Sequence, residues 1–139
     1  IGRRLDRLSD RTNETLTIAA VIGRQFSFDA LQELVEDTSE SQLLDVLDEA
    51  LDDRVIEELP TDAGVFPFTH ALIEQTLVEE LSLTSRVRLH ARIALVLETL
   101  YGDHVEAHAS QLAHHYAEAV TVLDEEKMVR YSILALKQR

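Results

Sequence analysis

The chain has 139 residues, no cysteine and a formal net charge of −13. Its 45% hydrophobic content can form a core without disulfides, and the missing cysteines exclude thiolate catalysis and cysteine-ligated zinc. An acidic chain repels phosphate backbones, which disfavours direct DNA binding, and a cysteine-free chain fits the reducing cytoplasm. No apolar run approaches the roughly 18 residues that a transmembrane helix requires, so no membrane partner is predicted.

The chain begins at Ile1 rather than Met, and its last residue, Arg139, falls within a helical pattern. We therefore expect a segment of a longer protein, with residues 1–10 forming the end of a preceding helical domain. Basic residues in this first stretch could face that domain; they are Arg3, Arg4 and Arg7.

Three helices are predicted in the first half of the chain. Caps and acids at 10–14 precede the apolar run 16–22, a combination that favours a buried helix over a strand. Ser27 is a suitable N-cap for a second, shorter helix. Ser39 and Gln42 have the spacing of a capping box, which starts a third helix with apolar residues along one face.

A β-hairpin is predicted after the third helix. Residues 55–59 and 65–69 have strand patterns, and the segment 60–64 between them has turn residues. Pro67 lacks a backbone donor and would confine the second strand to a sheet edge. Three helices followed by a hairpin is the order of a winged-helix domain, which we place at residues 11–81.

Further helices are predicted beyond the hairpin. One covers 70–81, a second follows a cap at Thr84 or Ser85 and stops at Gly102, and two more carry Val105–Val120 and Met128–Ala135. The last pair resembles one unit of a helical-hairpin repeat. The predicted fold class is therefore mainly α, with a winged-helix domain followed over residues 82–139 by the start of tetratricopeptide-like repeats.

The segment 68–73 places a histidine where a helix begins. Thr69 is predicted as the N-cap, which puts His70 in the first helical turn. Unpaired backbone N–H groups and the positive end of the helix dipole favour an anion at that position. The His70 ring could donate a hydrogen bond to a phosphate or carboxylate, or it could pack beside the hairpin.

Two other clusters have candidate functional residues. Arg86, Arg88 and Arg92 form a basic island, in which Arg88 and Arg92 share a helix face that could meet a partner's carboxylates or pair with acids of the same protein. His104 and His108 are four residues apart, as are His114 and Glu118, and such pairs could bind zinc from one helix face, but no HExxH pattern occurs and nothing fixes a third ligand. We therefore assign no metal site; the histidines concerned are His104, His108, His114 and His115.

Catalytic and DNA-reading patterns are absent from the sequence. It contains no GxSxG, GxxxxGK[ST] or GxGxxG motif, so the chain is not predicted to be an enzyme or to bind a nucleotide by itself. A DNA-reading winged helix would insert its third helix into the major groove. Here that helix carries Asp45, Asp48, Glu49 and Asp52, which would repel the phosphates.

Several short stretches resemble the segment that follows the nucleotide-binding core in STAND-class signalling ATPases. They are LDRLS at 5–9, AAVIGRQF at 19–26, FTHALI at 68–73, RLH at 88–90 and QLAHHY at 111–116. The chain is similar in particular to bacterial transcriptional regulators that combine an AAA-type ATPase, a winged helix and tetratricopeptide-like repeats. Such regulators are often fused to a LuxR-type DNA-binding domain or an adenylate cyclase.

The resemblance implies a mechanism of signal transduction. In STAND proteins the winged helix folds over bound ADP and holds the inactive state, and a histidine in a Met-His-Asp motif contacts a phosphate. His70 matches that histidine, while Thr69 and Ala71 stand where the family has Met and Asp. This implies that His70 and Thr69 contact a nucleotide held by an upstream domain of the parent protein.

The resemblance thus implies a non-catalytic regulatory segment whose first partner is the upstream domain. That domain would supply ATP or ADP with Mg²⁺, and other protomers or a signalling protein are further possible partners. The alternative is a helical protein–protein interaction scaffold that is indifferent to nucleotide and uses the Arg86–Arg92 face.

Overall fold

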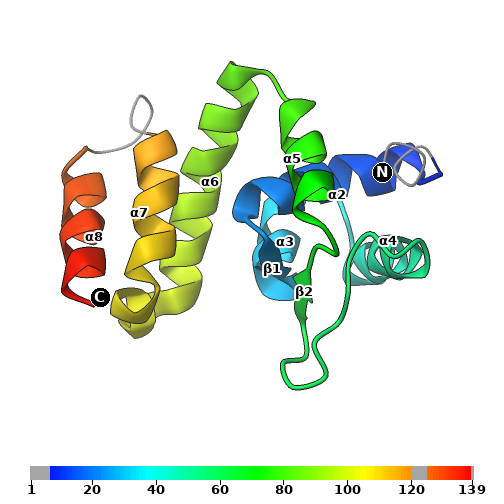
Figure 1. Ribbon diagram of the computed structural model, residues 1–139, viewed down its shortest axis with the longest axis horizontal. Coiled ribbons are helices and arrows are strands. Elements are labelled where there is room, and N and C mark those ends of the chain that lie inside the picture. Colours follow the sequence, from blue (N-terminus) through cyan, green and yellow to red (C-terminus); the bar gives the residue numbers. More distant parts are fainter. Residues whose placement is uncertain (1–6, 120–124, 139) are drawn as a thin grey trace. The chain divides into compact units, whose positions relative to one another are not determined.

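The computed structural model of the chain describes residues 7–119 and 125–138. It is mainly helical, with one small antiparallel sheet (Figure 1). Two compact units meet at the junction of Ser82 and Leu83, one residue from the predicted domain boundary. Within the described residues, no helix has the length and apolar content needed to cross a membrane.

Local capping explains where the helices of the first unit begin. Ser9 accepts a hydrogen bond from the Thr12 N–H, Ser27 caps the next helix in the same way, and Ser39 forms both bonds of a capping box with Gln42. The predicted caps at Ser27 and Ser39 are therefore confirmed. The helices are α2 (Asp10–Ile22), α3 (Phe28–Leu34), α4 (Glu40–Asp52) and α5 (Ala71–Glu79).

The sheet differs from the predicted hairpin. Strand β2 (Val65–Pro67) pairs with β1 (Gln25–Ser27), a strand that was not predicted, with Phe26 opposite Phe66. The predicted strand at 55–59 forms no ladder; it has two isolated bridges, Ile56 with Phe68 and Leu59 with Asp62. Backbone hydrogen bonds also join Glu57 to Pro67 and Thr69 to Val55. The predicted pairing of 55–59 with 65–69 is therefore present only as an isolated antiparallel bridge, and the ladder partner of β2 and its end at Pro67 differ from the prediction.

The prediction that Pro67 lies on a sheet edge is confirmed, because the sheet in the described residues has two strands and β2 is one of its edges. On one side of β2 the Phe68 N–H donates to the Arg24 carbonyl, and on the other the Pro67 carbonyl accepts from the Glu57 N–H. Peptide groups of successive residues point to opposite sides of a strand, so the missing proline donor faces Glu57. Only an isolated bridge forms on that side, and the missing donor therefore leaves the β1–β2 ladder intact.

The core of the first unit joins its helices to the sheet. The Phe26 ring lies 5.7 Å from the Phe66 ring and 5.5 Å from the Phe68 ring, measured between centroids. Helix α2 packs against α4, α5 and β1 and contributes the fully buried Leu16. Burial of such side chains is the main stabilising term of this unit, at about 1.5–3 kcal/mol for each large apolar side chain.

Within the described residues, the second unit contains three α-helices and a connecting 3₁₀-helix. They are α6 (Leu83–Tyr101), the 3₁₀-helix η1 (Gly102–His108), α7 (Ala109–Glu118) and α8 (Glu125–Lys137). Helix α7 packs against both α6 and α8, and the three lie side by side in Figure 1. Each carries one tyrosine, whereas all four phenylalanines of the chain belong to the first unit.

Two predicted boundaries in this unit were wrong. Helix α6 starts at Leu83, so Thr84 and Ser85 lie inside the helix instead of capping it. The segment that begins at Val105 starts as 3₁₀-helix and becomes α-helical only at Ala109. Val120, the predicted last apolar position of that helix, lies outside the described residues.

Candidate functional site

His70 is the N-cap residue of α5 and is exposed. Its backbone is extended, with φ −140° and ψ 138°, and its side chain makes no capping hydrogen bond. Its carbonyl accepts bonds from the N–H groups of Ile73 and Glu74, which start the helix. The predicted position in the first turn was wrong by one residue, and the ring nevertheless stands at the helix start.

Thr69 has a different role from the predicted N-cap. Its hydroxyl donates to the Arg54 carbonyl at 2.8 Å, and its backbone N–H donates to the Val55 carbonyl at 3.0 Å. Both bonds attach the residue before His70 to the segment that follows α4. Thr69 therefore fixes the backbone from which the His70 ring projects.

The acceptors of these bonds belong to a defined C-terminal cap of α4. The Arg54 N–H donates to the Leu51 carbonyl, and the Val55 N–H donates to the Ala50 carbonyl. Arg54 has φ 58°, so it takes the left-handed conformation that this Schellman arrangement requires. The backbone at Thr69, next to His70, is thus held by the C-terminal end of α4, where Arg54 lies 15 residues before Thr69.

A basic side chain lies close to the same segment. Arg24 Nε donates to the Phe68 carbonyl at 3.4 Å, while the Phe68 N–H donates to the Arg24 carbonyl at 2.9 Å. Arg24 is exposed, so it adds positive charge at the strand that leads into His70. Positive charge beside a helix N-terminus favours an anionic ligand.

A cavity of about 650 Å³ occupies another part of the first unit, between α4, the start of α3 and residues 58–66. Its lining does not include His70 or Thr69. Acidic side chains dominate its charge, and they would repel a phosphate. They are Asp29, Glu40, Asp48, Glu58 and Asp62.

The three arginines predicted as an interface do not share one surface. Arg88 and Arg92 are exposed one turn apart on α6, as their spacing predicts. Arg86 is half-buried, and its Nε atom is buried without a hydrogen-bond partner among the described residues. Arg3 and Arg4 lie outside the described residues, and Arg7 is exposed.

The histidines divide into two groups. His104 and His108 are exposed in η1, where His108 stacks on Tyr101 with 3.7 Å between ring centroids. His114 and His115, on α7, instead meet His90 of α6. His90 was not a predicted site residue, and its separation of 25 positions from His115 leaves no local pattern to detect.

The environment of His90 disfavours its charged form. Burial is the largest cause and lowers the pKa of His90 to about 4. The charges of His114 and Arg86 act in the same direction, and that of Glu118 opposes them. His90 is therefore a neutral imidazole at neutral pH.

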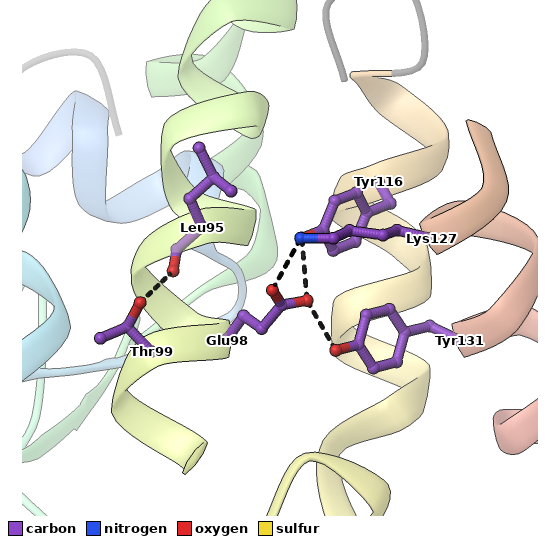
Figure 2. Close-up of polar contacts among 6 residues, drawn as sticks. All are labelled: Leu95, Glu98, Thr99, Tyr116, Lys127 and Tyr131. Atoms are coloured by element: carbon purple, nitrogen blue, oxygen red, sulfur yellow. Dashed lines mark hydrogen bonds and ion pairs between the residues drawn. The ribbon is translucent and has the colours of Figure 1, made fainter. Parts of the chain in front are cut away.

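A second polar cluster connects the three α-helices of this unit. Glu98 of α6 accepts hydrogen bonds from Tyr116 of α7 at 2.9 Å and from Tyr131 of α8 at 2.6 Å, and Lys127 lies 3.0 Å away (Figure 2). Burial acts to raise the pKa of Glu98, but the bonds from Tyr131, Lys127 and Tyr116 outweigh it, so this pKa lies below its ordinary value. Burial and the bond to Glu98 raise the pKa of Tyr131 to about 12.

Comparison with known proteins finds no relative of the chain. No family model matches it, and no curated protein or solved structure is significantly similar to it.

Proposed function

We propose that this chain is a non-catalytic regulatory segment of a STAND-type signalling ATPase. In this proposal an upstream P-loop domain binds ATP or ADP with Mg²⁺, and His70 senses the state of the nucleotide. Contacts that differ between the ADP and ATP states would shift the protein between a closed and an open arrangement. The segment would relay that shift to effector domains of a bacterial transcriptional regulator.

The exposed position of His70 is the observation that carries the proposal. The ring stands at the start of α5, and Thr69 is tied to the Arg54 and Val55 carbonyls one residue earlier. A ring on a fixed backbone can reach a ligand held by another domain with little loss of conformational freedom. Burial of this ring within its own unit would have argued against the proposal.

The motifs behind the family resemblance also meet in space. Residues 19–26 and 68–73 are far apart in sequence, but the Phe68 N–H donates to the Arg24 carbonyl and the Arg24 side chain donates to the Phe68 carbonyl. The Phe26 and Phe68 rings also pack together. These contacts support the view that both motifs belong to one site. The order of α2, α3 and α4 before β2 supports a winged-helix assignment for residues 11–81.

The outer face of α8 supports the proposed repeat region at residues 82–139. Val129, Ile133 and Leu136 are exposed by 46%, 48% and 64%, and their spacing places them along one side of the helix. A helical repeat buries such a face against the next repeat. The stacking of α6, α7 and α8 is compatible with the first helices of a tetratricopeptide-like array.

The test is His70→Ala in the full-length protein. A hydrogen bond to a charged group contributes about 1.5–3 kcal/mol, so we expect ADP to dissociate about tenfold faster or more, with raised basal output. His104→Ala is the matched control, because this histidine is also exposed but lies in η1. Stopped-flow release of a fluorescent ADP analogue gives the rate.

Equal ADP release from His70→Ala, His104→Ala and the unmodified protein would remove His70 from the mechanism. The scaffold alternative would then gain support, since Arg88 and Arg92 are exposed on one face of α6. It predicts that Arg88→Glu weakens partner binding while ADP release stays unchanged. A GxxxxGK[ST] motif in the sequence that precedes this segment is required by the ATPase proposal alone.

A further inference from the structure

Three histidine side chains converge between α6 and α7, within the second unit. His90 Nδ1 and His115 Nδ1 are 2.8 Å apart, and His114 completes the group. One ring nitrogen from each of the three lies within 4.8 Å of the others. His115 is fully buried and His90 is 8% exposed, whereas His114 is exposed to solvent.

The facing Nδ1 atoms of His90 and His115 form one hydrogen bond inside the cluster. A neutral imidazole carries a proton on only one of its two nitrogens, so one Nδ1 donates and the other accepts across the 2.8 Å contact. This hydrogen bond involves only the His90 and His115 rings, so it does not explain why His114 also lies in the cluster. The His114 ring meets the His90 ring edge-on at 5.5 Å and the His115 ring at 5.1 Å.

We propose that His90, His114 and His115 form a three-histidine site for a divalent transition metal, most suitably Zn²⁺, that joins α6 to α7. Imidazole nitrogens are preferred ligands of zinc, and three protein ligands with a fourth open position are a common arrangement. Tetrahedral coordination with Zn–N distances of 2.0–2.1 Å places neighbouring nitrogens roughly 3.3 Å apart. Small ring movements therefore convert the hydrogen-bonded pair into a coordinating pair.

Two charged residues near the cluster act on a bound cation in opposite directions. Glu118 and Arg86 both exert their charges on the His90 ring. Glu118 stands one turn after His114 on α7, where its carboxylate can occupy or face the fourth position. The Arg86 guanidinium opposes binding, so neutralising it should strengthen binding and neutralising Glu118 should weaken it.

The exposed ring gives the ion a path to the two buried ones. His114 lies at the surface, and the buried nitrogens of His90 and His115 lie behind it. Coordination by both Nδ1 atoms requires the proton between them to move to the Nε2 atom of its own ring, so both ligands remain neutral imidazoles and the pair releases no net proton. The bond lost is N–H···N between His90 and His115, and the bonds gained are the Zn–N bonds.

The test is titration of the 139-residue chain with Zn²⁺ by calorimetry and with Co²⁺ by visible absorption. We expect one ion per chain and the intense Co²⁺ bands of a tetrahedral site. His114→Ala should weaken Zn²⁺ affinity at least about tenfold, because a ligand contributes no less than the residues that orient it. The surface location of His114 lets this variant keep its fold, which circular dichroism checks. His104→Ala, another exposed histidine, should bind like the unmodified chain.

Absence of Zn²⁺ binding at millimolar concentration would overturn the proposal. Equal affinities of His114→Ala and the unmodified chain would also overturn it, since the ion would then be elsewhere. Arg86→Met and Glu118→Gln provide a second criterion, because both variants leave the three histidines unchanged. Tighter binding by Arg86→Met and weaker binding by Glu118→Gln support the site, and unchanged affinities in both contradict it.

Discussion

Arg54 holds a backbone conformation that usually belongs to glycine. Its φ of 58° lies in the left-handed region, where a side chain costs about 1–2 kcal/mol. The conformation persists because the Arg54 and Val55 N–H groups satisfy the last carbonyls of α4, and the Arg54 carbonyl accepts from Thr69. The backbone strain at Arg54 is thus offset by hydrogen bonds that connect the end of α4 to Thr69, the residue before His70.

We predict that Arg54→Gly stabilises the first unit by about 0.5–1 kcal/mol, after the greater freedom of glycine in the unfolded chain is subtracted. Chemical denaturation gives the free energy of unfolding. Arg54→Ala is the control, because it removes the same side chain and keeps the strained conformation. Equal stabilities for the glycine and alanine variants would contradict the role assigned to the backbone.

The N-cap residues show which roles of single side chains can be predicted from the sequence. The caps Ser27 and Ser39 were predicted because each bonds a backbone group three residues away. Thr69 has the same side-chain chemistry, but its hydroxyl donates to Arg54, 15 positions earlier, and leaves the N-cap position to His70. A local sequence pattern cannot predict that a distant carbonyl will bind the Thr69 hydroxyl.

At the scale of elements, Glu98 links three helices through one carboxylate. Tyr116 belongs to α7 and Lys127 and Tyr131 to α8, and all three reach Glu98 on α6 (Figure 2). The folded-state pKa of Glu98 is lowered from 4.5. Its ionised form therefore stabilises the second unit above that ordinary value, and this contribution is lost as the pH falls through the folded-state pKa.

Tyr131→Phe should lower the free energy of unfolding of the second unit by about 1–2 kcal/mol at neutral pH, because it removes a bond to a charged acceptor. The deficit should shrink as the pH falls through the lowered folded-state pKa of Glu98, where the carboxylate becomes protonated. Tyr101→Phe is the matched control, since the Tyr101 hydroxyl donates to the neutral Gln111 and its loss should not depend on pH in this range. A deficit for Tyr131→Phe that is constant from neutral to acid pH would contradict the assigned role of Glu98.

Elements made by pairing distant segments were the ones that the sequence did not predict. Strand β1 has three residues, too few for a periodic pattern, and it exists because Phe26 pairs with Phe66 40 positions later in the chain. The histidine cluster is similar, because His90 belongs to one helix and His114 and His115 to another. The helices themselves were predicted from the sequence because apolar spacing and capping residues are local properties.

At the scale of the molecule, charge is divided unevenly between the two units. Residues 1–82 carry 6 of the 13 basic and 19 of the 26 acidic residues, and residues 83–139 carry 7 of each. The whole net charge of −13 therefore belongs to the first unit, and the second is formally neutral. Self-repulsion of like charges destabilises a compact state, so the first unit should respond to ionic strength and the second should not.

We predict that raising the salt concentration from about 0.05 M to about 0.5 M stabilises residues 7–82 and leaves residues 83–138 nearly unchanged, because the screening length falls below the spacing of the surface acids. Hydrogen exchange followed by mass spectrometry resolves peptides from each unit. Equal gains in protection for both units would show that charge repulsion is not the cause.

The distribution of aromatic residues gives each unit its own optical signal. The chain has no tryptophan, and Tyr101, Tyr116 and Tyr131 stand one each on α6, α7 and α8. Intrinsic emission excited at the tyrosine band therefore originates entirely from residues 83–139, and phenylalanine fine structure in the near ultraviolet originates entirely from residues 1–82. Melting of either half can consequently be followed in the unlabelled protein without an introduced fluorophore.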